Sequence, residues 1–141
     1  MAQTIQFDLV SPERSLASLK VTAVQIPGSE GDLTAMPGHM PLITTLRPGV
    51  VKVSAPDVYQ EFVVTGGFAE IGDGLSILAE NAVLRSEIKQ SDFDQMIEEA
   101  EYTLNKAKEN VAGEPGLVDE MEKVMSDMLA LGDEIDLSHG K

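Results

Sequence analysis

Cysteine and tryptophan are absent from the 141-residue sequence, and only two histidines occur. The lack of cysteine excludes disulfides, thiolate nucleophiles and cysteine-ligated metals, and it is typical of a reducing compartment. No apolar run approaches the roughly 20 residues that span a bilayer. The first residues carry neither the basic nor the apolar segment of a secretory signal. These features predict a soluble protein of the cytosol.

Basic residues are also scarce, since ten Lys and Arg stand against 24 Asp and Glu, for a net charge of −14. Nucleic acids and anionic lipid surfaces carry the same sign, so we expect no nucleic-acid binding and no direct insertion into lipid. The charge is divided unevenly, with −4 on residues 1–90 and −10 on residues 91–141. The two compositions indicate two domains, which we expect at residues 1–88 and 89–141.

The first domain has the pattern of β-strands. Ile5, Phe7 and Leu9 alternate with polar residues, which is the period of a half-buried strand. Similar runs, separated by turns rich in proline and glycine, occupy residues 20–26, 50–54, 59–65, 68–71 and 75–79. No helical stretch of crossover length interrupts them. The predicted fold class is therefore α+β, beginning with an antiparallel β-sandwich.

The second domain has helical periodicity and is predicted to be an acidic helical hairpin with a short polar tail. We expect Ser91 to cap the first helix and Gly113 and Pro115 to end it. Each helix carries one apolar stripe, and Leu129 extends the second stripe. The residues predicted to pack the hairpin are Phe93, Ile97, Leu104, Met121, Met125 and Met128. The short connection between the stripes predicts antiparallel helices.

Residues that could carry chemistry are few. His39 lies in a loop rich in proline and glycine, where a local hydrogen bond or a partner contact is favoured over a catalytic base. His139 belongs to the polar tail, where solvent exposure is expected. No metal-ligand spacing, nucleophile elbow, dinucleotide fingerprint or phosphate loop occurs. We expect no catalytic residues, no metal and no cofactor, which argues against an enzyme acting alone.

The densest pattern lies between residues 24 and 49. It contains GSEGD at 28–32 and PGHxPL at 37–42, a tight polar turn followed by a loop stiffened by two prolines. So much rigid loop on a small sandwich predicts a docking surface. Together with TGGFAEI at 65–71 and LAExA at 78–82, in this order and spacing, the pattern closely resembles the epsilon subunit of the F-type ATP synthase.

The resemblance implies a ten-stranded β-sandwich followed by a helical hairpin, without an active site. It implies a rotor subunit of the central stalk, which transmits torque between proton flow and the catalytic head. Such a subunit is held against the gamma subunit and is seated on the ring of c subunits. Because no transit peptide is visible, we expect a peripheral location at the cytoplasmic face of the bacterial inner membrane, while a plastid-encoded protein would have the same features. By similarity, Glu30, Gly31, Asp32 and the loop of His39 lie near the polar loops of the c ring, and one face of the sandwich packs on gamma.

Two departures from the family bear on regulation. In many relatives the hairpin blocks ATP hydrolysis, with basic residues meeting an acidic region of the catalytic beta subunit. Here Lys123 is the single basic residue of the second helix against seven acidic ones, so repulsion predicts a weak or absent inhibitory role. In relatives that bind ATP, the hairpin has Arg and Ala where this chain has Ile97 and Glu98, so ATP binding is not expected.

Two functions of other classes are alternatives. One is a free-standing ligand-sensing module whose hairpin closes over a nucleotide, and the missing arginine argues against it. The other is a small acidic enzyme that uses carboxylates, which only their abundance favours.

Overall fold

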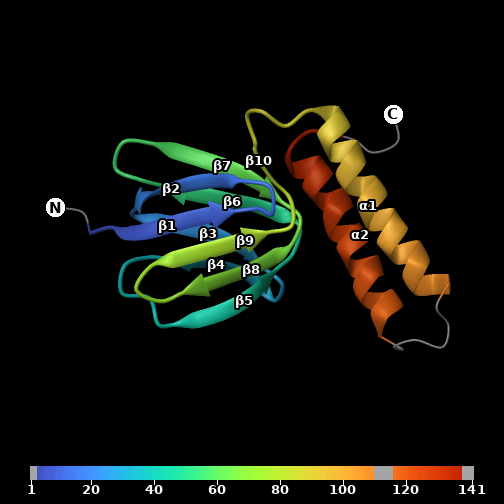
Figure 1. Ribbon diagram of the computed structural model, residues 1–141, viewed down its shortest axis with the longest axis horizontal. Coiled ribbons are helices and arrows are strands. Elements are labelled where there is room, and N and C mark those ends of the chain that lie inside the picture. Colours follow the sequence, from blue (N-terminus) through green and yellow to red (C-terminus); the bar gives the residue numbers. More distant parts are fainter. Residues whose placement is uncertain (1–2, 110–115, 138–141) are drawn as a thin grey trace. The chain divides into compact units, whose positions relative to one another are not determined.

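The computed structural model describes residues 3–109 and 116–137 (Figure 1). The chain divides into two compact units, Met1–Glu87 and Ile88–Lys141. The described part of the first unit is built from strands, and that of the second is built from two helices.

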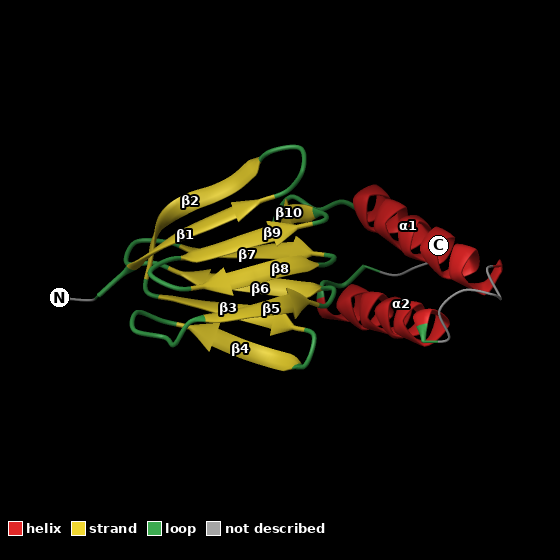
Figure 2. Ribbon diagram, turned by 60° about the horizontal axis from the view of Figure 1, so that its bottom comes forward, coloured by secondary structure: helices red, strands yellow, loops and turns green. Residues whose placement is uncertain are grey.

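The described part of the first unit holds ten strands, as the resemblance implied. They are β1 (Ile5–Val10), β2 (Ser15–Val21), β3 (Ala23–Gly28), β4 (Gly31–Ala35), β5 (Leu42–Leu46), β6 (Gly49–Ser54), β7 (Tyr59–Val64), β8 (Gly67–Ile71), β9 (Leu75–Ala79) and β10 (Ala82–Leu84). One layer has the order β4-β3-β6-β7-β10 and the other has the order β5-β8-β9-β1-β2, joined by the single pair Gly28–Leu46 (Figure 2). Within residues 3–109, β1–β9 is the one parallel pair in an otherwise antiparallel sandwich.

Alternation along the strands builds the core between the layers. In β1, Phe7 and Leu9 are fully buried, whereas Gln6 and Asp8 between them are partly exposed. Burial of apolar area is the main favourable term in folding, so this alternation fixes which face of each strand turns inward. The core of the described residues contains no buried polar or charged side chain. The predicted β-sandwich is confirmed.

The predicted strand runs do not cover β5 and β10, and two further details of the strand prediction are wrong. The run at residues 20–26 is two strands, because the chain turns at Thr22, whose N–H donates to the carbonyl of Ser54 at 2.8 Å. The segment expected to be a stiff loop contains β4, which pairs with β3 from Gly28↔Gly31 to Val24↔Ala35. Both differences arise from pairing with neighbouring strands, which a local sequence pattern does not reveal.

The helices of the second unit are α1 (Gln90–Glu109) and α2 (Leu117–Glu134), which lie side by side and antiparallel. Ser91 is not the cap, because α1 begins one residue earlier. The N–H of Lys89 donates to Oδ2 of Asp92 at 2.9 Å, and the carbonyl of Lys89 accepts the N–H of Phe93. The expected helix end at Gly113 and Pro115 lies outside the described residues. Neither of the described helices has the length and apolar character needed to cross a membrane.

Most of the hairpin stripe faces inward. Phe93, Ile97 and Met128 are buried, and the predicted residues Leu104, Met121 and Met125 are half-buried. Leu129 was wrongly included in the stripe, because its side chain is 45% exposed. Each helical residue turns by about 100°, so the buried positions that follow Met128 come three, four and seven residues later. They are Leu131, Gly132 and Ile135.

Candidate functional site

The acidic turn between β3 and β4 is held rigidly. Its glycine, Gly31, has φ +134°, which side chains rarely adopt. Arg47 holds the turn through two interactions. Its Nη2 forms an ion pair with Oδ1 of Asp32 at 2.5 Å, and its Nη1 donates a hydrogen bond to the carbonyl of Gly28 at 2.7 Å. The carboxylate of Asp32 is therefore engaged, whereas Glu30 at the tip of the turn is exposed.

A second pair of hydrogen bonds ties the same turn to β5. The N–H of Ser29 donates to the carbonyl of Thr45 at 2.9 Å, and the two side-chain hydroxyls lie 2.6 Å apart. Sequence reasoning selected the acidic residues of this turn but missed Arg47 and Thr45. No local sequence pattern predicts these contacts, because Arg47 lies 15 residues beyond Asp32 and Thr45 lies 16 residues beyond Ser29.

His39 lies at the opposite end of β4 from the acidic turn. Gly31 begins β4 and Ala35 ends it, so the strand separates the two by roughly 13–16 Å. Nδ1–H of His39 donates to the carbonyl of Met40 at 2.6 Å, and its backbone N–H donates to the carbonyl of Met36 at 3.0 Å. The structure thus brings Glu30, Gly31 and Asp32 together in one turn but does not bring His39 to them.

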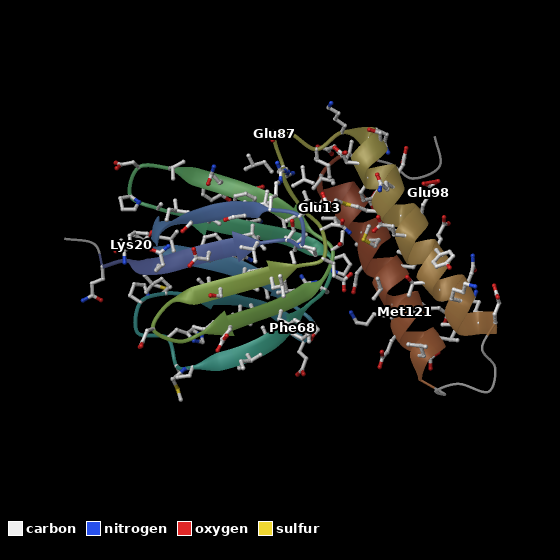
Figure 3. All side chains as sticks on the ribbon, in the orientation of Figure 1. Glu13, Lys20, Phe68, Glu87, Glu98 and Met121 are labelled. Carbon is white, nitrogen blue, oxygen red and sulfur yellow. The ribbon has the colours of Figure 1, made fainter. Side chains whose placement is uncertain are left out.

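Large apolar side chains are exposed on the outer face of the β5-β8-β9 layer. Ile43 of β5 is 69% exposed, Phe68 of β8 is 55% exposed and Leu78 of β9 is 50% exposed (Phe68 is labelled in Figure 3). Thr45 pairs with Phe68, and Phe68 pairs with Leu78, so these strands present one continuous surface. Exposed apolar patches of this kind mark docking surfaces. We call this surface the apolar face.

A separate polar cluster joins β7 to the chain beyond β10. Oε1 of Glu61 contacts Nη1 of Arg85 at 2.5 Å, and Oε2 accepts the hydroxyl of Tyr59 at 2.6 Å. The hydrogen bond from Tyr59, followed by those from Arg85, holds the pKa of Glu61 below its usual value, although burial opposes this. The N–H of Arg85 also donates to the carbonyl of Glu61. The cluster fastens the last residues of the first unit to β7.

Glu61→Gln is expected to lower the free energy of unfolding by about 1 kcal/mol near pH 7, because it removes a charge-assisted hydrogen bond. The folded pKa of Glu61 lies below the ordinary value of 4.5, so its stabilisation is present above that pH and is lost as the pH falls through the folded pKa. The wild type should therefore lose more stability than the variant as the pH falls below 4.5. Urea unfolding midpoints measured against pH check this.

Glu13→Gln is the matched control, because Glu13 is exposed in the β1–β2 turn (Figure 3). It should leave the pH profile of the wild type unchanged. If Glu61→Gln also follows the wild-type profile, the cluster contributes nothing to stability.

No group of three or more potential metal ligands occurs in residues 3–109 and 116–137. Asp94 accepts a hydrogen bond from Nε2 of Gln90 at 2.9 Å. Of the two positions that the sequence comparison with ATP-binding relatives singled out, Ile97 is fully buried and Glu98 is exposed. His139 lies outside the described residues.

The protein-family model described as ATP synthase, delta/epsilon chain, β-sandwich domain, matches residues 4–85 of this chain. The ATP synthase epsilon chain of Ruegeria sp. (strain TM1040) is 55% identical over 97% of this chain and 100% of its own length. The chain belongs to the ATP synthase epsilon chain family. The epsilon chain of Paracoccus denitrificans is 50% identical over 97% of this chain and 94% of its own.

Solved structures agree in fold with this epsilon chain. A chain of the Euglena gracilis mitochondrial ATP synthase superimposes with a TM-score of 0.66 at 22% identity, over 94% of this chain and 81% of that one. A chain of the Tetrahymena thermophila mitochondrial ATP synthase, described as central stalk and c ring, gives 0.64 at 17% identity, over 94% and 96%. At these identities the likeness concerns the fold.

Membership in the family confirms the identification made from the loop motifs. As an epsilon chain, the protein is a non-catalytic subunit of an ATP synthase. Neither the ligand-sensing module nor the acidic enzyme is needed to explain it. The contact of Glu30, Gly31, Asp32 and His39 with the c ring stays a prediction.

Proposed function

We propose that this epsilon chain is a rotor subunit in the central stalk of a proton-translocating F-type ATP synthase. It couples rotation of the c ring to the gamma subunit and the catalytic head, and it works at the cytoplasmic face of the bacterial inner membrane as a peripheral protein. Two findings support this: the relatives are bacterial epsilon chains, and the similar Tetrahymena chain comes from an assembly described as central stalk and c ring.

The apolar face is the surface proposed to pack on gamma. Phe68 and Leu78 are exposed cross-strand partners, and Ile43 is exposed two residues further along β5, so covering them would remove apolar area from water. The loop that carries His39 borders this surface, because it leads directly into β5, and its Met40 is 78% exposed. This exposed apolar surface is the observation that carries the proposal.

The acidic turn is proposed to face the polar loops of the c ring. Glu30 is exposed at its tip, and Arg47 and Thr45 hold the backbone of the turn in place. A rigid turn presents its polar groups without a large ordering cost on binding. The loop of His39, at the other end of β4, is proposed to reach the loops of the c ring at a second point.

The hairpin is proposed to inhibit hydrolysis weakly or not at all. Lys123 is the one basic residue of α2, and its Nζ pairs with Oδ2 of Asp127 at 2.9 Å. Asp136 follows the end of α2, so the helix itself carries six acidic residues. An acidic region of the catalytic beta subunit would meet net negative charge and repel it, within the reach of about 8–10 Å that salt permits.

Truncation after Ile88 tests the inhibitory role. The complex is assembled with the full chain or with residues 1–88, and ATP hydrolysis is measured in both. Because no strong brake is removed, we expect the two rates to agree within about twofold. A several-fold rise on truncation would show that the hairpin is a working brake after all.

The same preparations test the rotor assignment. Full chain and residues 1–88 should both be retained by gamma and by the c ring, since both surfaces belong to the sandwich. Loss of both partners in the full chain would contradict the central-stalk assignment. Retention by gamma but not by the c ring would support the proposed contact with gamma and contradict the proposed contact with the c ring.

A further inference from the structure

Two rows of side chains cross the outer surface of strands β8, β9 and β1, next to each other. The first row is apolar and consists of Phe68, Leu78 and Val10, which are cross-strand partners. The second row, two residues away on each strand, is polar and consists of Glu70, Ser76 and Asp8. Both rows line one groove of about 430 Å³. The groove therefore has an apolar side and an acidic side.

The two carboxylates of the groove have no cationic partner in the described ranges 3–109 and 116–137. Asp8 accepts a long contact of 3.5 Å from Nε2 of Gln6, and Glu70 is exposed without a hydrogen bond or ion pair there. Water satisfies both while the surface is open. A protein that covers the apolar row also removes water from these carboxylates, which is costly unless the partner supplies cations.

The dimensions of the groove match a helix. Residues two apart on a strand are separated by about 6.6 Å, close to the roughly 6 Å between positions i and i+4 of an α-helix. Three neighbouring strands span roughly 10 Å, which is close to the diameter of a helix. A helix laid along the strands can therefore set an apolar side chain on the first row and, one turn later, a basic side chain on the second.

We propose that the groove receives a helix of gamma whose contacting face carries apolar side chains that cover Phe68 and Leu78 and, one turn away, Lys or Arg side chains that pair with Asp8 and Glu70. The inference rests on the proposed docking of gamma on the apolar face and names the chemistry of that docking. Phe68 and Leu78 supply the apolar area that is buried on binding, and the carboxylates of Asp8 and Glu70 select a positively charged partner. Residues 1–90, which hold the groove, carry a net charge of −4, so a basic partner segment is the complementary choice.

The experiment measures binding of the full-length chain to purified gamma by calorimetry at about 0.05 M and about 0.3 M NaCl. Glu70→Gln and Asp8→Asn should each weaken binding by about three- to tenfold at the lower salt concentration, and the double variant should lose most of the salt dependence. Asp57→Asn is the matched control, because Asp57 is exposed in the β6–β7 turn, away from the groove. It should leave affinity and salt dependence unchanged.

The outcomes separate this inference from the gamma assignment. Phe68→Ala should weaken binding by more than about tenfold, and its side chain is exposed, so the fold should persist by circular dichroism. If gamma binds Phe68→Ala as tightly as wild type, the apolar face is not its site. If Phe68→Ala weakens binding but the Asp8/Glu70 double variant keeps wild-type affinity and salt dependence, the basic helix is overturned. Hydrogen exchange that maps the protected segment of gamma to a non-helical region would overturn the helix as well.

Discussion

Gly67→Ala is expected to destabilise the β-sandwich by roughly 3 to 5 kcal/mol, because two costs add at this position. A Cβ atom on Gly67 would lie 1.9 Å from the carbonyl oxygen of Leu78 and 2.9 Å from Cα of Ala79. Both are backbone atoms of β9, so no side chain can rotate away. Gly67 also has φ +125°, a conformation that side chains rarely adopt. The substitution must therefore distort either β8 or its pairing with β9.

The change should appear as a fall of more than about 10 °C in the melting temperature measured by circular dichroism. Gly72→Ala is the control, because a Cβ there would meet nothing within 4 Å and φ is not positive. It should leave stability unchanged or raise it by up to about 1 kcal/mol, since it restricts the unfolded chain. A melting temperature for Gly67→Ala within a few degrees of wild type would mean that β8 and β9 relax around the new methyl group.

Local pattern predicted most of the sandwich where a strand alternates strictly. Ile5, Phe7 and Leu9 gave β1 almost residue by residue, because one face of that strand is buried and the other is not. The same reasoning failed at β4, where Gly31 and the following proline-rich loop resemble turn chemistry. What makes residues 31–35 a strand is the ladder with β3, which forms only after the chain folds back.

The candidate surfaces were predictable to different degrees. The acidic turn follows from the motif at residues 28–32, but its restraint by Arg47 does not, because Arg47 and Asp32 are joined by folding and not by spacing. The apolar face and the groove depend on register. Glu70 and Asp8 look like ordinary alternating polar residues until β8, β9 and β1 are aligned, and then they stand in one row.

Helix phase explains the error in the hairpin. Leu129 has the apolar character of a stripe residue, yet it is 45% exposed, while Gly132 is buried against α1. A Cβ on Gly132 would lie 2.8 Å from Cζ of Phe93, so the aromatic ring occupies the space that a side chain would fill. Glycine is not counted as an apolar residue in a sequence pattern, even where its position faces inward. For this reason the prediction assigned Leu129, and not Gly132, to the buried stripe.

Phe93→Ala is expected to destabilise the helical unit by about 3 to 5 kcal/mol, because a fully buried aromatic ring is lost and a cavity remains. The loss should appear as faster hydrogen exchange of the amides of α1 and α2 and as lower helical signal on heating. Tyr102→Ala removes an aromatic ring from the same helix, but the side chain of Tyr102 is 64% exposed. Within the described residues, the recorded contact of its ring is with Nζ of Lys106. That control should cost less than about 1 kcal/mol.

Gly132→Ala tests whether the ring of Phe93 is the reason for the glycine. Helix propensity alone favours alanine by about 1 kcal/mol, whereas overpacking against Phe93 and the carbonyl of Leu137, 2.6 Å from the new Cβ, should cost roughly 1 to 3 kcal/mol. In the Phe93→Ala background the new methyl group enters the vacated space, so the double variant should be more stable than the sum of the single changes predicts. Strict additivity would mean that the clash with Leu137, and not the aromatic ring, excludes a side chain at position 132, and the coupling of α1 to α2 through this pair would have to be abandoned.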